Sequence, residues 1–278
     1  MGSTPPEEID KQHQAAQNLV DSNTPCADVT YRDEISLVWK QTPTEELKNS
    51  TTSDCPCFSS RGHANVSKLV SLVKEGYNDK LDLSNASSGR DIQSLTNLWD
   101  EANAAANNVN MTRPSHDAWG IKKIVLVFSD DFLQDTYEMP WWHARPDIRE
   151  AVEPVLNVLN IPACRVVRLL LAALPPGVTI PTHHDSGEWV KYTHRVHCPV
   201  IVTDPTKVLF TCGLSTEEML RVDCSPGHVF ELNNQGKHAV SNCGEDHRVH
   251  LILDYVDDDF ESVQQHTFLN RPRRRLLL

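Results

Sequence analysis

Two histidines and one aspartate are the residues whose types and spacing most clearly suggest chemistry. His183 and Asp185 are separated by a single residue, and His238 follows later in the same half of the chain. On an extended segment, residues two apart point to the same face, so His183 and Asp185 would present their side chains together. Two imidazoles and one carboxylate form the ligand set of a facial triad, which leaves coordination positions open for a co-substrate and O₂ on Fe(II). We therefore treat these three residues as candidate metal ligands.

The remaining histidines are the background against which this pattern is weighed. The chain has 13 histidines, and eight of them fall between residues 183 and 250. A His-x-Asp sequence often arises by chance, and a single histidine is more often a core or surface residue than a ligand. We interpret five members of this group as structural or exposed, namely His184, His194, His228, His247 and His250.

The strand predicted at 249–255 divides its side chains between two faces. Alternation places four apolar residues on the face that we expect to pack between two sheets, namely Val249, Leu251, Leu253 and Tyr255. The opposite face carries Arg248, His250, Ile252 and Asp254. A buried guanidinium is unfavourable unless an anion pairs with it. A dicarboxylate co-substrate would supply that anion in a bidentate pair, and Asp254 is the internal alternative. Arg195 and His197 are also two apart and share a face.

Short apolar runs bounded by turn residues predict the elements that must position these side chains. Strands are predicted at 121–128, 166–171, 196–203, 208–212, 219–222, 228–232, 239–242 and 249–255. Helices are predicted at 66–75, 91–106 and 147–159. This spacing favours an all-β sandwich or barrel over βαβ units. Trp141 and Trp142 could form a lid or a packing contact, and we prefer packing.

Length, charge and composition limit the function classes. The chain has 278 residues and a formal net charge of −12, which does not favour nucleic-acid binding because phosphate contacts need clustered Lys and Arg. It contains no run of about 18 apolar residues that could span a membrane, and it begins without a signal peptide. We therefore expect a cytoplasmic protein. Most of the eight cysteines are interpreted as buried thiols, with a Cys26–Cys55 pair as the alternative.

Five stretches of the second half of the chain resemble one known family. They read PGVTIPTHHD at 176–185, HRVHCP at 194–199, PG at 226–227, NNQGKHAVSN at 233–242 and RVHLILD at 248–254. In order and spacing they are similar to the aspartyl/asparaginyl β-hydroxylases, a family that also includes bacterial free-proline hydroxylases. The resemblance covers roughly 119–256.

This resemblance implies a fold and a division of the chain. Members of the family have a double-stranded β-helix, a cupin-like jelly roll, so we expect a mainly β protein with flanking helices. Residues 119–260 would form the dioxygenase domain. Residues 28–118 would be a helical or irregular N-terminal region, 1–27 disordered, and 261–278 a basic tail.

The resemblance also implies an activity and its residues. The family uses Fe(II), 2-oxoglutarate and O₂, with ascorbate as a supporting reductant, to insert one oxygen into an unactivated C–H bond and release succinate and CO₂. By motif, His183, Asp185 and His238 correspond to the iron ligands. Arg248 corresponds to the arginine that binds the distal carboxylate of 2-oxoglutarate. Arg195 and His197 correspond to a second pair of co-substrate contacts.

Two departures bear on the substrate. Family members that act on protein domains have glycine where this chain has Asp185, and serine where it has Ala172. Both departures favour an amino acid or related small molecule as substrate, with Trp189 and Glu188 as candidate contacts. The alternatives are a hydroxylase of a residue in a peptide or protein, and a non-catalytic cupin-like metal- or ligand-binding module. The sequence leaves the oligomeric state open.

Overall fold

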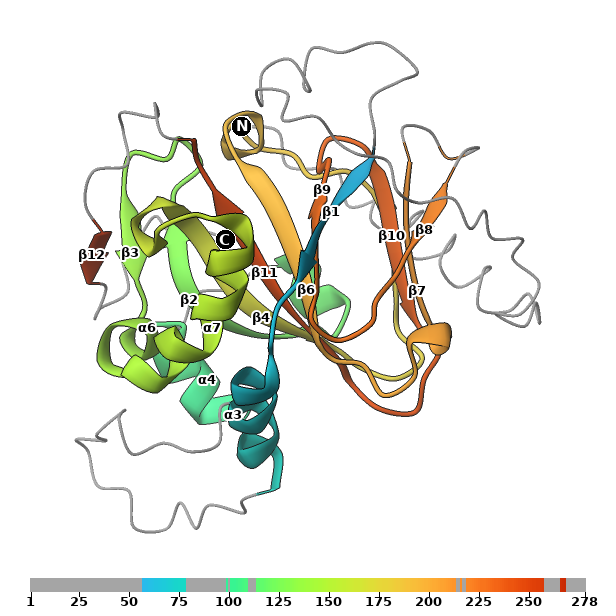
Figure 1. Ribbon diagram of the computed structural model, residues 1–278, viewed down its shortest axis with the longest axis horizontal. Helices are drawn as coiled ribbons and strands as arrows, with labels where there is room; N and C mark the ends of the chain where they lie inside the picture. The colour runs from blue at the N-terminus through green and yellow to red at the C-terminus, as the bar shows by residue number, and fades with distance from the viewer. Residues whose placement is uncertain are drawn as a thin grey trace.

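Two facing β-sheets form the body of the protein (Figure 1). The computed structural model describes residues 57–78, 99, 101–109, 114–213, 216, 219–257 and 266–268. The larger sheet has the order β1 (Phe58–His63), β9 (His228–Leu232), β6 (His194–Ile201), β11 (Arg248–Tyr255), β4 (Val166–Leu174), β2 (Lys122–Ser129), β3 (Thr136–Glu138) and β12 (His266–Phe268). The smaller sheet has the order β5 (Thr179–His183), β10 (Lys237–Asn242), β7 (Val208–Gly213) and β8 (Leu220–Val222).

The strands from β4 to β11 alternate between the sheets as they do in a double-stranded β-helix. Along the chain, β4, β6, β9 and β11 join the larger sheet, whereas β5, β7, β8 and β10 join the smaller one. The neighbours in this part of both sheets are antiparallel. This arrangement confirms the predicted jelly roll, and it brings strands that are distant in sequence side by side at each end of the roll.

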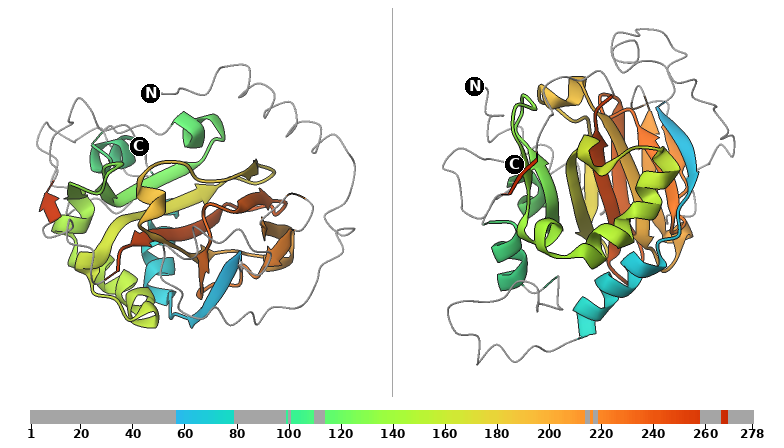
Figure 2. Two further views of the ribbon diagram at one scale, coloured as in Figure 1. Left: turned by 90° about the horizontal axis from the view of Figure 1, so that it is seen from above. Right: turned by 60° about the vertical axis from the view of Figure 1, so that its left-hand side comes forward.

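Helices cover the outer face of the larger sheet (Figure 2). The helical elements are α3 (Ser67–Asn78), α4 (Glu101–Asn107), α5 (Pro114–Ala118), α6 (Pro140–Ala144) and α7 (Pro146–Leu159), with short 3₁₀ turns at Ala163–Arg165, Trp189–Lys191 and Pro205–Lys207. Pro146 occupies the first turn of α7, where its missing N–H has no helical partner to lose. Trp141 and Trp142 are buried in the core beneath these helices, which confirms packing over a lid.

The two faces of β11 differ from the predicted arrangement. Val249, Leu251 and Leu253 do alternate with polar residues, but they pack with the helices on the outer face of the sheet, not between the sheets. Arg248 and its same-face neighbours point into the roll. The physical reason is that the roll interior accommodates polar side chains, so the helices provide the apolar cover for the outer face.

The region predicted as helical or irregular contributes more to the roll than expected. Residues 58–63 form β1, an edge strand that pairs with β9, and α3 follows within the predicted helix 66–75. Only the end of the helix predicted at 91–106 is described, as α4. Residues 266–268, predicted as part of the tail, form β12 and pair in parallel with β3. Residues 1–27 lie outside the described residues.

Two smaller expectations can also be checked. Four described cysteines are buried thiols and Cys164 is an exposed one, whereas Cys243 is disulfide-bonded. Cys26 and Cys55 lie outside the described residues. Within the described part of the chain, no helix has both the length and the apolar character needed to cross a bilayer.

Candidate metal centre

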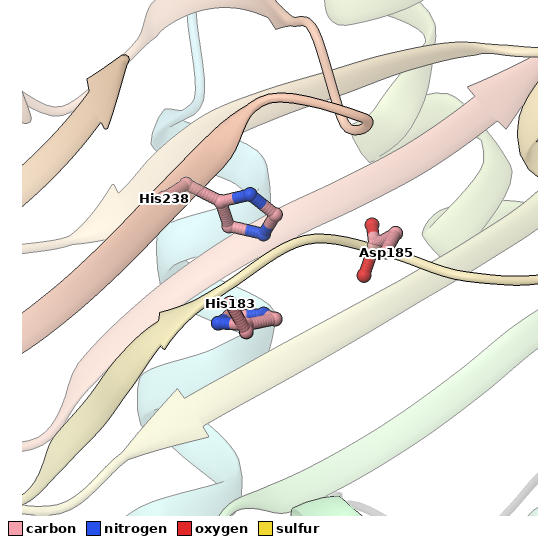
Figure 3. A group of neighbouring side chains, drawn as sticks. All are labelled: His183, Asp185 and His238. Atoms are coloured by element: carbon pink, nitrogen blue, oxygen red, sulfur yellow. The ribbon is translucent and has the colours of Figure 1, made fainter. Parts of the chain in front are cut away.

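The three predicted ligands converge at one end of the roll. His183 is the last residue of β5 and lies directly across from His238 of β10, with ring centroids 4.2 Å apart. Asp185 follows in the loop after β5 and faces both rings (Figure 3). One potential ligand atom from each of the three side chains lies within 4.8 Å of the others. The backbone N–H of Asp185 donates to the carbonyl oxygen of Asn234 at 2.9 Å, which ties this loop to the turn before β10.

The hydrogen bonds of both histidines suit metal binding. The Nδ1 of His183 lies 2.8 Å from the carbonyl oxygen of Pro181, and the Nδ1 of His238 lies 3.2 Å from that of Gly236. A proton held on Nδ1 by a carbonyl places the lone pair on Nε2, the form that coordinates a metal ion. Burial, with the nearby His183, lowers the pKa of His238 to about 4, so this imidazole is neutral at pH 7. The donor set therefore fits a divalent cation.

Arg195 lies between two carboxylates. Its Nη1 is 2.7 Å from Oδ2 of Asp185, and its Nε and Nη2 donate to Asp254 at 2.8 and 2.9 Å. Arg195 and Asp254 are direct cross-strand neighbours on β6 and β11. Arg195 was predicted as a co-substrate contact, and in the structure its Nε and Nη2 donate to Asp254 while its Nη1 forms an ion pair with Asp185. Arg195 is therefore an ion-pair partner of Asp185, one of the proposed metal ligands.

Arg248 is buried without a carboxylate. No acidic side chain among the described residues pairs with it, and its Nε has no hydrogen-bond partner. Its Nη2 lies 2.8 Å from the Nδ1 of His250, and its guanidinium lies over the ring of Phe210. Burial lowers the pKa of Arg248 to about 10. Because Asp254 pairs with Arg195, the internal alternative for Arg248 is wrong.

His197 and His250 lie beside Arg248, and we call these three residues the Arg248 cluster. Neither ring nitrogen of His197 has a hydrogen-bond partner, and neither has the Nε2 of His250. The ring of His197 stacks on Phe230 at 5.5 Å and lies 6.0 Å from that of His250. Burial, followed by the nearby arginines, holds the pKa of His197 well below its usual range. The Arg248 cluster therefore contains buried nitrogen atoms without hydrogen-bond partners, packed against the rings of Phe210 and Phe230.

His250, which was interpreted from the sequence as structural or exposed, lies beside Arg248 and His197 in the structure. Its side chain is fully buried, and burial beside Arg248 and His197 holds its pKa well below the usual range. The signal that could have identified it is its position two residues after Arg248 on the same face of β11. Ala172 lies opposite His250 on β4, in the interior of the roll.

The two predicted substrate contacts lie in the loop that follows Asp185. Trp189 is only 4% exposed, and the guanidiniums of Arg168 and Arg195 lie over its ring at 4.1 and 4.7 Å. A side chain that is buried to this extent leaves little surface for a substrate, so the structure does not support the prediction for Trp189. Glu188 pairs with Lys191 at 2.8 Å on the surface of the loop.

Comparison with known proteins gives distant structural similarities and one family. The chain is similar to a 2OG-Fe(II) oxygenase family oxidoreductase from Burkholderia pseudomallei, with 11% identity over 49% of this chain and 66% of that one, just under two thirds of its length, at TM-score 0.39. It is also similar to the nickel complex of the non-heme monooxygenase ThoJ, with 14% identity over 79% and 86% of the chains, at TM-score 0.41. A cupin domain from Bordetella pertussis matches with 20% identity over 35% and 88%, at TM-score 0.26. No curated protein matches.

A family model settles the assignment. The model described as aspartyl/asparaginyl beta-hydroxylase matches residues 94–258, which is more than half of the chain and includes His183, Asp185, His238 and the whole Arg248 cluster. The chain therefore belongs to the aspartyl/asparaginyl β-hydroxylase family.

Proposed function

We propose that this protein is an Fe(II)- and 2-oxoglutarate-dependent hydroxylase of an amino acid or related small molecule, which inserts one oxygen into an unactivated C–H bond and releases succinate and CO₂. The observation that carries the proposal is Arg248, a buried cation that has no acidic partner among the described residues although it lies in the same roll as a His-Asp-His set. A buried charge of this kind calls for an external anion.

Each group of residues has a separate task in this proposal. His183, Asp185 and His238 would hold Fe(II), which together with 2-oxoglutarate supplies the oxidising power for C–H hydroxylation. Arg248 would bind the distal carboxylate of 2-oxoglutarate, because a guanidinium matches a carboxylate in two parallel hydrogen bonds. His197 is neutral, and its single ring N–H would donate to the same molecule. Phe210 and Phe230, which pack against Arg248 and His197, would keep water away from this cluster.

The charges of the site support a divalent metal and a dianionic co-substrate together. Asp185 and Asp254 contribute two negative charges, and Arg195 and Arg248 contribute two positive ones. These four buried charges cancel. A divalent cation and a dicarboxylate also cancel, so binding both leaves the interior neutral, whereas binding either one alone does not. Charge neutrality lowers the penalty for burying ions in the roll.

The small-molecule part of the proposal is supported by the ligand set. Asp185 provides a third protein ligand, as in the members of the family that this chain resembles at 183–185 and that act on free amino acids. The protein-acting members have glycine there. The loop of residues 186–193 begins directly after this ligand and would form part of the substrate entrance, with Glu188 as the candidate partner for a substrate amine.

One observation favours the second candidate, a hydroxylase of a residue in a peptide or protein. Phe132 and Tyr192 are the large hydrophobic residues that stand exposed in the described part of the chain, at 64% and 40%. Tyr192 belongs to the loop after Asp185, and Asp131 beside Phe132 accepts from the backbone N–H of Glu188 in that loop. Exposed aromatic side chains near an entrance could contact an extended substrate.

The substrate class can be tested with two matched panels. Succinate release from 2-oxoglutarate is measured with Fe(II) and ascorbate, first with free amino acids and then with peptides that carry the same residues internally. The proposal predicts stimulation by a free amino acid. Stimulation by peptides alone, with a KM raised when Phe132 and Tyr192 are replaced by serine, would establish the second candidate. No stimulation and no iron-dependent binding of 2-oxoglutarate would refute the proposed reaction.

A further inference from the structure

Arg195 is the most fully paired charged side chain of the metal centre. Its guanidinium contacts Asp185, a proposed metal ligand, on one side and Asp254 on the other. Both Arg195 and Asp254 are buried, and Asp254 has no exposed surface. The fork of the guanidinium fits this task because Nε and Nη2 bind Asp254 side by side, which leaves Nη1 to contact Asp185.

A second contact fixes the plane of this guanidinium. The ring of Trp189 packs against the guanidinium of Arg195, and the guanidinium of Arg168 packs against the same ring. Trp189 lies in the loop that begins at Asp185. Asp185 and Trp189 both contact Arg195, so this loop folds back onto the arginine. This return is tight: a Cβ on Gly187 would lie 2.6 Å from Oδ1 of Asp131 and 2.7 Å from Nε1 of Trp189.

We propose that Arg195 is a positioning residue that sets the orientation of the Asp185 carboxylate for metal binding, and that Asp254 and Trp189 hold Arg195 in place for this purpose. The inference rests on the metal site of the proposed function. A ligand that binds through one oxygen can contact a metal ion and a guanidinium at the same time, so the two interactions are compatible. Groups that orient the ligands of a metal in this way usually change its affinity by about 10- to 100-fold when they are removed.

Two physical effects of Arg195 on the metal have opposite signs, which makes the proposal testable. As a positive charge close to the site, Arg195 repels a cation, so its removal would tighten metal binding. As a positioning residue, it holds the carboxylate in place, so its removal would weaken metal binding. The direction of the change in metal affinity therefore distinguishes a positioning role from a purely electrostatic or structural one.

The experiment measures Co²⁺ affinity by competition with a chelating dye, using the full chain without 2-oxoglutarate. Arg195→Met is expected to weaken Co²⁺ binding by about 10- to 100-fold. Arg168→Met is the matched control, because it loses the stacking on Trp189 without losing a contact to Asp185. It should lower the thermal stability of the metal-free protein and leave the Co²⁺ affinity within threefold of wild type.

A double-mutant cycle with Asp185→Gly gives the decisive readout. In that background Arg195 has no ligand to orient, so adding Arg195→Met should leave Co²⁺ affinity unchanged or improve it. If Arg195→Met does not fold, Arg195→Lys replaces it, since a single ammonium cannot contact both carboxylates in the same fork. Unchanged or tighter Co²⁺ binding by the single Arg195 variant would overturn the inference. Failure of the wild-type chain to bind Co²⁺ would instead refute the metal site itself.

Discussion

Replacing Arg248 by methionine should have opposite effects on the stability of the protein and on its affinity for 2-oxoglutarate. Burial lowers the pKa of Arg248 from its ordinary 12.5 to about 10, which corresponds to about 3 kcal/mol against the charged form. No carboxylate of the described residues compensates this cost. Arg248→Met keeps an unbranched side chain of similar length and removes the charge. The ligand-free protein is therefore expected to gain about 1–3 kcal/mol in its free energy of unfolding.

Binding of 2-oxoglutarate should be lost in the same variant. Removing one partner of a buried, hydrogen-bonded charge pair costs about 2–5 kcal/mol. At about 1.4 kcal/mol for each tenfold change, the Kd for 2-oxoglutarate should rise by about 30-fold to a few thousand-fold. Calorimetric titration of the metal-loaded protein under anaerobic conditions measures the Kd, and urea denaturation measures the free energy of unfolding.

Arg221→Met is the matched control for this prediction. The Nη2 of Arg221 donates to the carbonyl oxygens of Pro205, Thr206 and Val208, so this arginine has structural partners that Arg248 lacks. Its loss should lower stability and leave the Kd for 2-oxoglutarate unaltered. If Arg248→Met changes that Kd by less than threefold, the co-substrate carboxylate binds elsewhere and the reasoning is refuted.

Two further predictions concern stability and the loop after Asp185. Burial opposes a charge on His194, but contacts with Asp257 and Glu231 outweigh it and raise the pKa of His194 to about 9. Protonated His194 therefore stabilises the fold fully below pH 6.5, and this contribution of up to about 3 kcal/mol is lost as the pH rises through 9. In urea denaturation at a series of pH values, His194→Gln should flatten this pH dependence of the free energy of unfolding. An unchanged pH profile in the variant would contradict the prediction. Gly187 has φ +137° and no room for a Cβ, whereas Gly120 has φ +66° and nothing within 4 Å of the position that a Cβ would take. Gly187→Ala should therefore lower the melting temperature more than Gly120→Ala does. Equal losses in melting temperature would show that the close contacts with Asp131 and Trp189 do not matter.

The shared face of His183 and Asp185 could be predicted because it depends on local spacing, whereas their meeting with His238 depends on the register of β5 and β10. His183 and Asp185 were placed together by the period of an extended chain, and the structure confirms that they meet His238. Eight strands from 121 onward followed in the same way from apolar runs and turn residues, whereas β3, β5 and β12 were not predicted. The shared face of His183 and Asp185 and the predicted strands needed only residues close to one another in the sequence.

The partner of Arg195 could not be predicted because it depends on strand register. Arg195 and Asp254 face each other only because β6 and β11 pair at that register, which the loops and the rest of the sheet determine. The alternation of side chains along β11 was predicted, but its apolar face was assigned to the core between the two sheets. That face packs against the helices instead, which the sequence of one strand does not indicate. Strand β1 was missed because it pairs with β9, far along the chain, and has little apolar character of its own.

Iron binding by the wild-type protein and two histidine variants tests most directly the central claim that His183, Asp185 and His238 hold the metal. Equilibrium dialysis with Fe(II), under anaerobic conditions and with 2-oxoglutarate present, gives the amount of iron retained by each chain. The account predicts one iron per wild-type chain, one per His184→Ala chain, and essentially none for His238→Ala, because His184 is an exposed neighbour of the ligands and His238 is itself a ligand. Retention of iron by His238→Ala at the wild-type level would contradict the account.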